Sequence, residues 1–577
     1  MDGDEDGIEG GLRFRAALVA VGLLQGVGFY LLAEADWTSH TPLLIAAVTF
    51  CVLAPATFEL TFGLGPLVRA GAAALGLAVP LALLGLWADY RLTGGGAVPF
   101  ADHRPVFYGA VAITAYIAWP YLQAWVATGR ARFPYPLLFR FAWSNAPVAA
   151  VAAAFLGVFW LVLWLWGALF GLVGVNFFRH LFERAEFAWV FSGGVFALGV
   201  AIARENERLV PALRRVVLML FQVLAPVLAA VSLLFLAFLP FTGLDPPWGT
   251  KSATAVLVCL MFALTLFTNA VVQDGGHPLP FGRWMGWLMA ATLLALPVFA
   301  GIALYAIRAR IGQYGLTPER FIAQIIVVVA AAHVLAYAAG VVLQRRHWAG
   351  FVVRINPWVA PAVALVAVLL QTPLADPYAF SARDQVARLK SGRADATGFD
   401  YAFLKFRLGQ PGRDALKRLA ALSNHPQQAV IREKLARIAQ ADTYYRATLD
   451  QAPTESEIGV LRSRLVVRPE GAEVPDAVLE QVMSDHHWFA DRCHDDDNAC
   501  GVLVADPDRD GRSDYVFISR RPGAQLAVGQ RDGRWHTATL SASGDAAETW
   551  AAFIAGDIEL VEPAYYDIRI GKNRLHF

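Results

Sequence analysis

Four aspartates near the C-terminus have the types and the spacing of a calcium-binding loop. In the stretch VADPDRDGRSDYVFIS, which begins at Val504, three aspartates occupy alternate positions, a glycine follows, and a fourth aspartate comes shortly after it. Calcium binds about six to eight hard oxygen atoms, and alternate carboxylates around a tight glycine turn direct several oxygens inward. The predicted ligands are the side chains of Asp506, Asp508, Asp510 and Asp514 and the backbone carbonyl of Arg512.

The loop differs from an EF-hand, and its predicted role is structural. An EF-hand needs a bidentate glutamate at its last ligand position, where this chain has Phe517. The residues YVFIS favour a strand over a helix, so the loop resembles the aspartate-rich calcium loops of β-propeller repeats and related extracellular modules. Calcium would serve as a structural cofactor, since nothing nearby supplies a nucleophile for it to activate. The alternative is a solvated acidic turn.

Two of the four cysteines lie close together in a polar segment. Cys493 and Cys500 bracket the stretch CHDDDNAC, and their separation allows a small disulfide in an oxidising compartment. Cys51 and Cys259 lie in apolar runs, where a cysteine usually acts as a small core residue. We therefore predict a disulfide between Cys493 and Cys500.

The same polar segment contains side-chain types that bind zinc in other proteins. Histidines and aspartates are frequent in SDHHWFADRCHDDDNAC, yet their spacing matches none of the usual zinc sites. Histidines beside aspartates are more often surface residues. We therefore interpret the following as surface residues and not as zinc ligands: His486, His487, His494 and Asp495 to Asp497.

The composition indicates a membrane protein. The 577 residues are 57% hydrophobic and only 16% charged, with a mean hydropathy of +0.47, which is far too apolar for a soluble protein of this length. The formal net charge is +1, so no basic field argues for nucleic acid and no acidic excess argues for a cationic partner. We expect the lipid bilayer as a partner and no nucleic acid.

Eleven apolar segments are long enough to cross a membrane as helices. A helical span needs about 20 apolar residues, and such segments recur up to Leu374. Short spans near Leu60 to Leu67 leave a single re-entrant hairpin as an alternative. The expected limits are Ala16 to Ala33, Pro42 to Leu60, Leu67 to Trp87, Val106 to Ala127, Pro147 to Val173, Phe187 to Ala203, Val216 to Phe241, Ala253 to Val272, Met285 to Ile307, Phe321 to Leu343 and Trp358 to Leu374.

Basic residues in the short loops predict the orientation. The N-terminal stretch MDGDEDGIEGG is acidic and no cleavage site follows it, so we expect the first span to remain as an anchor. Arg13 and Arg15 mark its cytoplasmic flank. The loops expected inside carry somewhat under twice as many basic residues as those expected outside, which favours a cytoplasmic N-terminus. An odd number of spans then places everything after Leu374 outside the cytoplasm.

The segment after Leu374 has the composition of a soluble domain. We expect two amphipathic helices in GRDALKRLAALSNHPQQAVIREKLARIAQA and hairpin turns in QRDGRW and DIRIGKNRLHF. The predicted fold is an all-α polytopic membrane helix bundle of about eleven transmembrane helices followed by a small soluble α+β domain. The expected parts are an acidic cytoplasmic tail (1–15), the transmembrane domain (16–374), a helical linker region (375–450) and an extracytoplasmic α+β domain (451–577).

Polar residues in or near the spans are the candidates for a site in the membrane. Such residues are costly in lipid and therefore informative. One interpretation is that these residues lie at the membrane interface, with arginine and glutamate at helix ends. The alternative is that they line a polar cavity for a headgroup or an ion. They are Asn176, Arg179, His180, Arg204, Glu205, Asn206, Glu207, Asn269, Gln273, Asp274 and His333.

Three stretches carry a family resemblance. They are LFRFAWSNAPVAAVAAAFLGVFWLVLWLWGALFGLVGVNFF, YGLTPERFIA and DPYAFSARDQVARLKSGRADATGFDYAFLKF. Together they resemble a bacterial family of polytopic membrane proteins catalogued as a domain of unknown function. The resemblance implies an integral protein of the bacterial inner membrane and brings no catalytic residues with it.

The familiar catalytic signatures are absent from the sequence, which has no Walker loop, no HExxH and no GxSxG. A transporter would need a broken helix or a buried ionisable pair near the middle of the membrane. Pro226, Pro297 and Pro361 can kink helices, but His333 is the only ionisable residue deep in a predicted span, which argues against proton-coupled transport. We expect a non-enzymatic component of envelope transport or sensing, with a cation-stabilised periplasmic domain and an unspecified small-molecule or envelope ligand. The alternative is a membrane-embedded enzyme acting on lipid or glycan, with Glu205 or Glu207 as a base near the headgroups.

Overall fold

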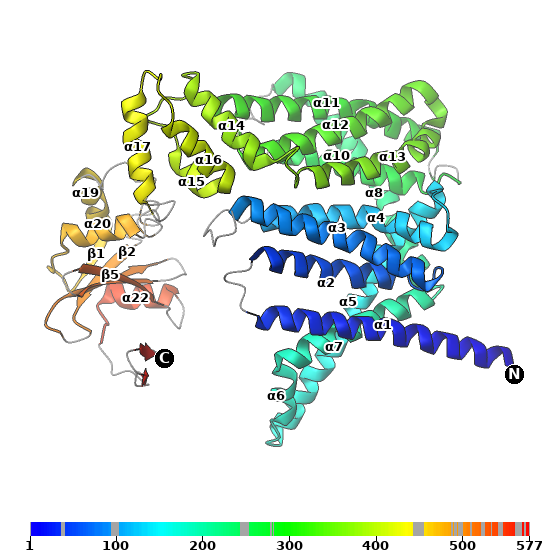
Figure 1. Ribbon diagram of the computed structural model, residues 1–577, viewed down its shortest axis with the longest axis horizontal. Coiled ribbons are helices and arrows are strands. Elements are labelled where there is room, and N and C mark those ends of the chain that lie inside the picture. The colour runs from blue at the N-terminus through cyan, green and yellow to red at the C-terminus, as the bar shows by residue number, and fades with distance from the viewer. Residues whose placement is uncertain are drawn as a thin grey trace. The chain divides into compact units, whose positions relative to one another are not determined.

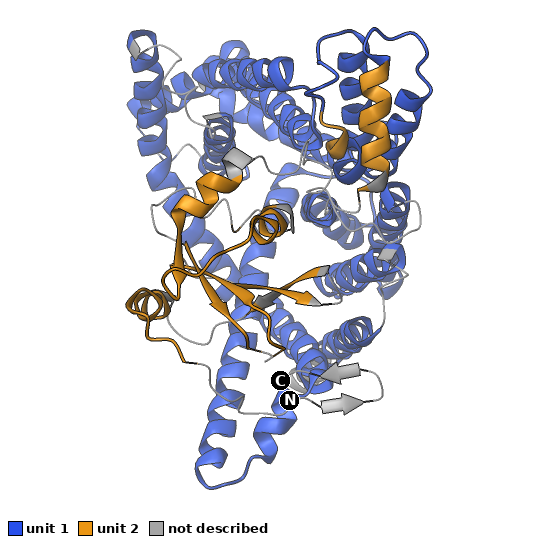
Figure 2. Cartoon of the chain, turned by 90° about the vertical axis from the view of Figure 1, so that its left-hand side faces the viewer, with its two compact units in different colours: residues 1–399, 404–428 blue, residues 400–403, 429–577 orange. Residues whose placement is uncertain are grey.

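The computed structural model divides the chain into two compact units, which Figure 2 colours separately. Unit 1 contains residues 1–399 and 404–428, and unit 2 contains residues 400–403 and 429–577. The sequence-based division after residues 374 and 450 therefore differs from the structural one, which places residues up to 428 mostly with the helical unit. The structure describes residues 2–35, 41–93, 103–242, 253–276, 280, 282–441, 455–485, 489, 493, 500–507, 510–520, 525–531, 534–540, 546–559, 568–570 and 573–575.

Unit 1 is a bundle of long apolar helices, as the sequence predicts. Within the described residues, 11 helices have the length and hydropathy needed to cross a membrane, so the chain is a multi-pass membrane protein. Each overlaps one predicted span, and separate full-length α2 and α3 rule out the re-entrant hairpin. The bounds are α1 Asp2–Glu34, α2 Thr41–Thr61, α3 Leu67–Thr93, α4 Arg104–Thr128, α5 Tyr135–Leu172, α7 Ala185–Glu205, α8 Leu209–Thr242, α10 Ala253–Val272, α11 Arg283–Tyr314, α12 Pro318–Gln344 and α13 Trp348–Leu369.

Three of these helices begin well before their predicted limits, and the first is α1, which begins at Asp2 instead of Ala16. α5 begins at Tyr135 instead of Pro147, and α13 begins at Trp348 instead of Trp358. The predicted start of α5 is a proline and that of α13 directly follows one, and proline is favourable in a first helical turn, yet Pro147 and Pro357 lie inside continuous helices. The 38 residues of α5 correspond to about 57 Å at the usual rise per residue. This length exceeds the bilayer core of about 30 Å, so α5 must tilt or extend beyond it.

Polar side chains in the bundle satisfy backbone carbonyls that the helices leave free. Pro55 has no N–H, so the carbonyl of Cys51, one turn earlier, lacks its helical donor. The side-chain amide of Gln25 donates to that carbonyl at 3.0 Å. Arg204 of α7 similarly donates to two carbonyls at the end of α2. Because lipid offers no hydrogen-bond partners, these contacts allow the helix irregularities to lie within the membrane.

Helices α1 and α7 cross at very close range, side by side in Figure 1. A Cβ atom added to Gly193 would lie 2.1 Å from the carbonyl oxygen of Gly22, and one added to Gly22 would lie 2.3 Å from the carbonyl oxygen of Gly193. Small residues at such crossings let two backbones approach each other within a membrane. Glycine is therefore required at both positions.

The helices after the last span pack on the end of the bundle within unit 1. Ser381 of α14 (Pro377–Lys390) donates to the carbonyl of Leu316 at 2.8 Å, and Asp384 accepts the N–H of Leu316 at 2.8 Å. These bonds fasten α14 to the turn between α11 and α12. Arg413 of α16 (Gly409–Ala420) donates to the carbonyl of Thr93 at the end of α3, at 2.9 Å. The short α15 (Tyr401–Arg407) connects α14 and α16.

Unit 2 contains a five-stranded sheet in the order β1-β2-β3-β4-β5, in which only the β1–β2 pair is parallel. The predicted hairpin turns are confirmed, between β4 and β5 and between β6 and β7. The two amphipathic helices expected after the last span are α16, which belongs to unit 1, and α17, most of which belongs to unit 2. The bounds are α17 Gln428–Gln440, α19 Glu455–Arg464, β1 Leu465–Arg468, α20 Asp476–Asp485, β2 Cys500–Ala505, β3 Asp514–Ser519, β4 Gln525–Arg531, β5 Arg534–Leu540, α22 Ala546–Ala555, β6 Ile568–Ile570 and β7 Asn573–Leu575.

Helices cover both faces of this sheet. Cys500 and Val502 point into a core that also contains residues of α19 and α20. Gly501 lies between them and faces the other side, because successive residues of a strand alternate between faces. A Cβ atom at Gly501 would lie 2.1 Å from the ring of Phe553, so α22 packs closely on this second face. The small α+β domain predicted from the sequence is confirmed.

Candidate functional site

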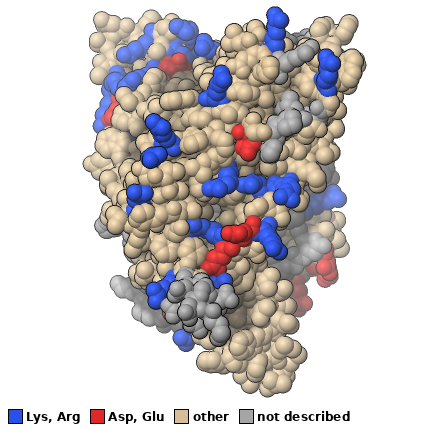
Figure 3. All heavy atoms as spheres, turned by 90° about the vertical axis from the view of Figure 1, so that its right-hand side faces the viewer, with Lys and Arg blue, Asp and Glu red and all other residues tan. Residues whose placement is uncertain are grey.

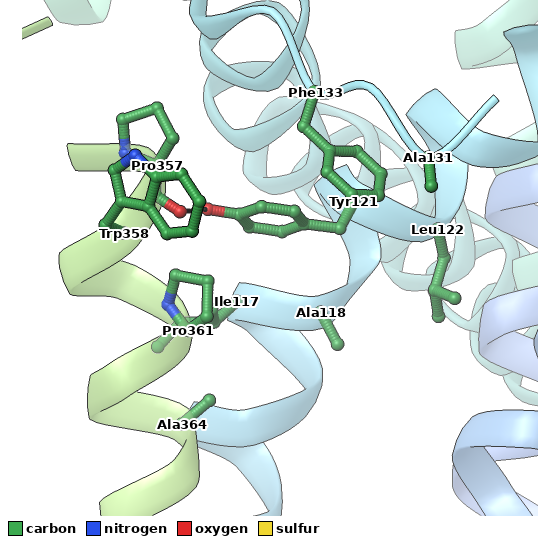
Figure 4. Close-up of a pocket in the computed structure, with 10 residues that line it drawn as sticks. All are labelled: Ile117, Ala118, Tyr121, Leu122, Ala131, Phe133, Pro357, Trp358, Pro361 and Ala364. Carbon is green, nitrogen blue, oxygen red and sulfur yellow. Dashed lines mark hydrogen bonds between the residues drawn. The ribbon is translucent and has the colours of Figure 1, made fainter. Parts of the chain in front are cut away.

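A groove runs between α4 and α13 in unit 1. Its volume is about 700 Å³, and most of the side chains that line it are apolar (Figure 4). Trp358 is 77% exposed, so the groove opens at the surface of the bundle. The lining residues are Ile117, Ala118, Tyr121 and Leu122 of α4, Ala131 and Phe133 of the following loop, and Pro357, Trp358, Pro361 and Ala364 of α13.

Tyr121 reaches across the groove from α4 to α13. Its hydroxyl donates to the carbonyl oxygen of Pro357 at 2.9 Å (Figure 4). Pro361 follows one turn later and has no N–H, so this carbonyl has no donor within α13. A buried carbonyl without a partner costs about 1–3 kcal/mol. Tyr121 thus ties the two walls of the groove together at the point where α13 is irregular.

A second, smaller cavity of about 200 Å³ adjoins the groove. Ile117, Tyr121 and Pro357 line both spaces. The second cavity extends to the side chains of Asn269 and Asn356. The apolar groove therefore adjoins a cavity whose inner end is polar, so apolar walls and hydrogen-bonding groups lie close together for a ligand that has both kinds of group.

The polar end is a hydrogen-bonded network of side chains from four helices. Asn356 Nδ2 donates to Asn269 Oδ1 at 2.6 Å and to the hydroxyl of Tyr135 at 3.1 Å. The hydroxyl of Tyr337 donates to Asn356 Oδ1 at 2.7 Å, and Asn269 Nδ2 donates to the carbonyl of Thr265 at 2.9 Å. Tyr337 is fully buried. The network fixes the ends of α5, α10, α12 and α13 relative to one another.

The chemistry available here is hydrogen bonding by neutral amides and phenols. None of the four network side chains is a carboxylate, an imidazole or a cation, so this network offers binding rather than acid–base catalysis. Its position is near one membrane face, because Tyr135 is the first residue of α5 and Asn269 lies close to the end of α10. A hydroxyl or a carbonyl group of a ligand would find partners at this depth.

His333, which the sequence singles out in mid-span, lies one helical turn from Tyr337. The two rings meet edge to face with centroids 4.8 Å apart. The buried Nε2 atom of His333 has no hydrogen-bond partner among the described residues. The imidazole therefore packs against the network without taking part in its hydrogen bonds.

The charged residues at the end of α7 connect helices to one another. Glu205 accepts from Arg15 of α1 at 2.6 Å, and Arg204 binds the carbonyls at the end of α2 while lying over the ring of Phe14. Glu207 is exposed. Sequence reasoning missed Glu59, which is only 3% exposed and whose Oε1 has no partner in the described part of the chain.

Other polar residues named from the sequence lie outside the network. Arg179 pairs with Glu183 at 3.0 Å on an exposed surface of α6 (Phe177–Glu183). Asn206 accepts backbone N–H groups at the start of α8, and Asp274 accepts the N–H of Gly276 in a turn. These contacts agree with the interfacial interpretation. Of the predicted membrane candidates, Asn269 alone belongs to the network.

The aspartate loop joins β2 and β3, as the sequence predicts, and its turn is held by its own side chains. Asp506 accepts the N–H groups of Asp510 and Gly511 at 3.1 and 3.0 Å, and Asp510 accepts the N–H of Arg512 at 2.8 Å. Gly511 has a φ of 84°, which favours glycine. No three His, Cys, Asp or Glu side chains gather as a metal-binding group within the described residues. Asp508 lies outside those residues, and Asp514 begins β3.

Calcium binding by the complete loop stays a prediction. Each Asp506 oxygen that accepts one N–H keeps a second lone pair for a cation. We expect the full-length protein to melt at a higher temperature in millimolar calcium than in chelator, by differential scanning fluorimetry in detergent. Replacing Asp508 and Asp510 together by alanine should remove the difference. An equal melting temperature in both buffers would contradict calcium binding and favour the alternative interpretation, a solvated acidic turn.

The predicted disulfide is present in unit 2. Cys493 and Cys500 are bonded, with Cα atoms 5.6 Å apart, and both side chains lie in the core between sheet and helices. Cys51 and Cys259 are free; Cys259 is exposed on α10, so the expectation of a core position fails for it. His486, His487, His494 and Asp495 to Asp497 lie outside the described residues.

Sequence reasoning missed most of the groove and network. Tyr121, Tyr135 and Tyr337 look like ordinary interfacial aromatics in a sequence. Asn356 carries a usable signal, because an amide within a span needs a partner, but its position before the predicted start at Trp358 concealed it.

No family model, curated protein or solved structure matches this chain. The resemblance to a bacterial family of unknown function therefore stays a prediction. The functional proposal depends on the geometry of the groove and the network alone.

Proposed function

We propose that this protein is a non-enzymatic membrane component that takes part in envelope transport or sensing. It would bind an amphiphile in the groove between α4 and α13. The observation that carries the proposal is an apolar groove of about 700 Å³ next to a cavity that reaches Asn269 and Asn356, with Ile117, Tyr121 and Pro357 lining both spaces. An acyl or isoprenoid chain fits the apolar walls, and a hydroxyl or carbonyl group fits the neutral network.

The proposed location is the bacterial inner membrane, with the N-terminus in the cytoplasm and unit 2 in the periplasm. Figure 3 faces the side of the molecule on which the N-terminus of α1 lies, and many basic and few acidic side chains are visible there. An excess of basic residues at the ends of spans favours the cytoplasmic side. A periplasmic unit 2 also agrees with its disulfide.

The rival proposal, an enzyme using Glu205 or Glu207, has less support. Glu205 is paired with Arg15, and Arg204 is engaged by backbone carbonyls instead of being available to bind phosphate. Glu207 is exposed near the start of α8. An acid–base catalyst needs a carboxylate that reaches a bound substrate, and the groove lining contains none.

The amphiphile proposal is tested by filling the groove. We expect the full-length protein, washed in detergent and examined by native mass spectrometry, to retain one lipid molecule per chain. Ala364→Phe should lower this retention about tenfold, because excluding two methylene groups costs about 1.6 kcal/mol. Ala154→Phe, on an exposed surface of α5, makes the same change away from the groove and should have no effect.

Two results would contradict the groove as the binding site. One is equal lipid retention by wild type, Ala364→Phe and Ala154→Phe. The other is equal loss in both variants, which would indicate a general effect on the micelle. Ala118→Phe fills the opposite wall and should reproduce the loss seen with Ala364→Phe if that variant folds poorly.

A further inference from the structure

We infer that the amphiphile is an anionic glycerophospholipid, whose phosphate is bound by Arg130 and Arg132 at the mouth of the groove. This inference rests on the proposed function, because it names the class of ligand that the same groove binds. It adds a headgroup site formed by the loop between α4 and α5, which lies outside the polar network described above.

The loop that carries both arginines forms part of the groove wall. Ala131 lines the groove, and Arg130 and Arg132 are its immediate neighbours in the chain. The loop is short and its ends are fixed. Gly129 ends α4 with a φ of 66° and donates its N–H to Trp125, and α5 begins directly after Pro134.

Both guanidinium groups are available to a ligand. Arg130 and Arg132 are exposed, and neither side chain has an ion pair or a side-chain hydrogen bond in the described part of the chain. The stretch from Thr128 to Arg140, TGRARFPYPLLFR, contains no acidic residue. A third cation is close, since a Cβ atom at Gly129 would lie 2.5 Å from Nη1 of Arg69. This cluster of positive charge is therefore not neutralised by its own loop.

The depth of the groove matches a lipid whose headgroup lies at this loop. Tyr121 and Ile117 precede the end of α4 at Thr128 by about 10 and 16 Å at the rise of an α-helix. About 15 Å is half of the hydrocarbon core, so the groove extends through roughly one leaflet. Figure 4 shows Ala131, Phe133 and Pro357 toward one end and Ala364 toward the other, with Tyr121 between them.

Charge complementarity decides between headgroups. Arginine binds phosphate through paired, charge-assisted hydrogen bonds, and basic residues at a membrane surface attract anionic lipids. A neutral diacylglycerol could fill the same apolar walls but would leave the two arginines without an anion. We therefore expect an anionic phospholipid to bind about tenfold more tightly than a diacylglycerol with the same chains.

The test compares two lipids with the same acyl chains, one with an anionic phosphoglycerol headgroup and one without it. The delipidated full-length protein is titrated in neutral detergent with dioleoylphosphatidylglycerol or with dioleoylglycerol, and native mass spectrometry gives the fraction that carries one lipid. Arg130→Gln with Arg132→Gln should reduce phosphatidylglycerol binding to the level of dioleoylglycerol and leave dioleoylglycerol binding unchanged. Arg208→Gln with Arg215→Gln removes two exposed charges at other span ends and should alter neither titration.

Several results would overturn the inference. They are equal binding of the two lipids by wild type, unchanged phosphatidylglycerol binding after loss of Arg130 and Arg132, or an equal loss in the Arg208 and Arg215 control. Displacement of phosphatidylglycerol by millimolar inorganic phosphate would also overturn it, because the site would then bind free phosphate. If Ala364→Phe leaves both lipids bound, the groove proposal itself fails, whereas failure of the arginine variants alone removes only the headgroup assignment.

Discussion

Replacing Gly193 by alanine should destabilise the folded membrane protein by about 3 kcal/mol, at the upper end of the range for overpacked sites. The new Cβ atom would lie 2.1 Å from the carbonyl oxygen of Gly22, and that neighbour is backbone, which no side-chain rotation can move away. Helices α1 and α7 would have to separate over their whole crossing. The small-residue contact between them would then lose much of its van der Waals attraction.

Gly157→Ala is the matched control for this substitution. Gly157 lies inside α5, and a Cβ atom there would have no atom within 4 Å outside its own helix. Alanine favours a helix over glycine by up to about 1 kcal/mol at both positions, so only the crossing distinguishes them. The free energy of unfolding is measured by titration with sodium dodecyl sulfate in mixed micelles, followed by tryptophan fluorescence. Equal stabilities of the two variants would refute the close crossing.

The membrane part of the fold could be predicted from the sequence because a span is a local property. Any stretch of about 20 apolar residues satisfies the bilayer by itself, and 11 such helices are found where 11 were expected. Helix ends were less predictable. The expected starts at Pro147 and Trp358 were too late, because a proline need not end a helix in a bundle, where another helix can supply the missing donor, as Tyr121 does for the Pro357 carbonyl that Pro361 leaves free.

The candidate site could not be predicted, because it depends on which helices become neighbours. Asn269 and Asn356 are 87 residues apart in the chain, and their hydrogen bond forms only when α10 and α13 meet. Hydropathy gives no information about this pairing. In contrast, the disulfide between Cys493 and Cys500 was predictable, since its partners are only seven residues apart and need no distant contact.

The ion pair between Arg91 and Asp376 gives a second large effect, because it joins the end of α3 to the start of α14 inside unit 1. Asp376 is 1% exposed and the side chain of Arg91 is 17% exposed. The same carboxylate caps α14, since its Oδ1 accepts the N–H of Tyr378 at 2.9 Å. Arg91→Ala removes the cation and leaves a buried negative charge, so we expect a loss of about 3–5 kcal/mol.

A double variant that removes both charges of the Arg91–Asp376 pair distinguishes the cost of a buried unpaired charge from a loss of packing. Arg91→Met with Asp376→Asn keeps two side chains of similar size, and asparagine caps a helix about as well as aspartate. This double variant should therefore recover most of the stability that Arg91→Ala loses, whereas Lys417→Ala, which removes an exposed pair with Asp414, should change it by less than about 1 kcal/mol. The measurement is the same detergent titration. If the double variant is as unstable as Arg91→Ala, the loss comes from packing around Arg91 and not from the charge left on Asp376.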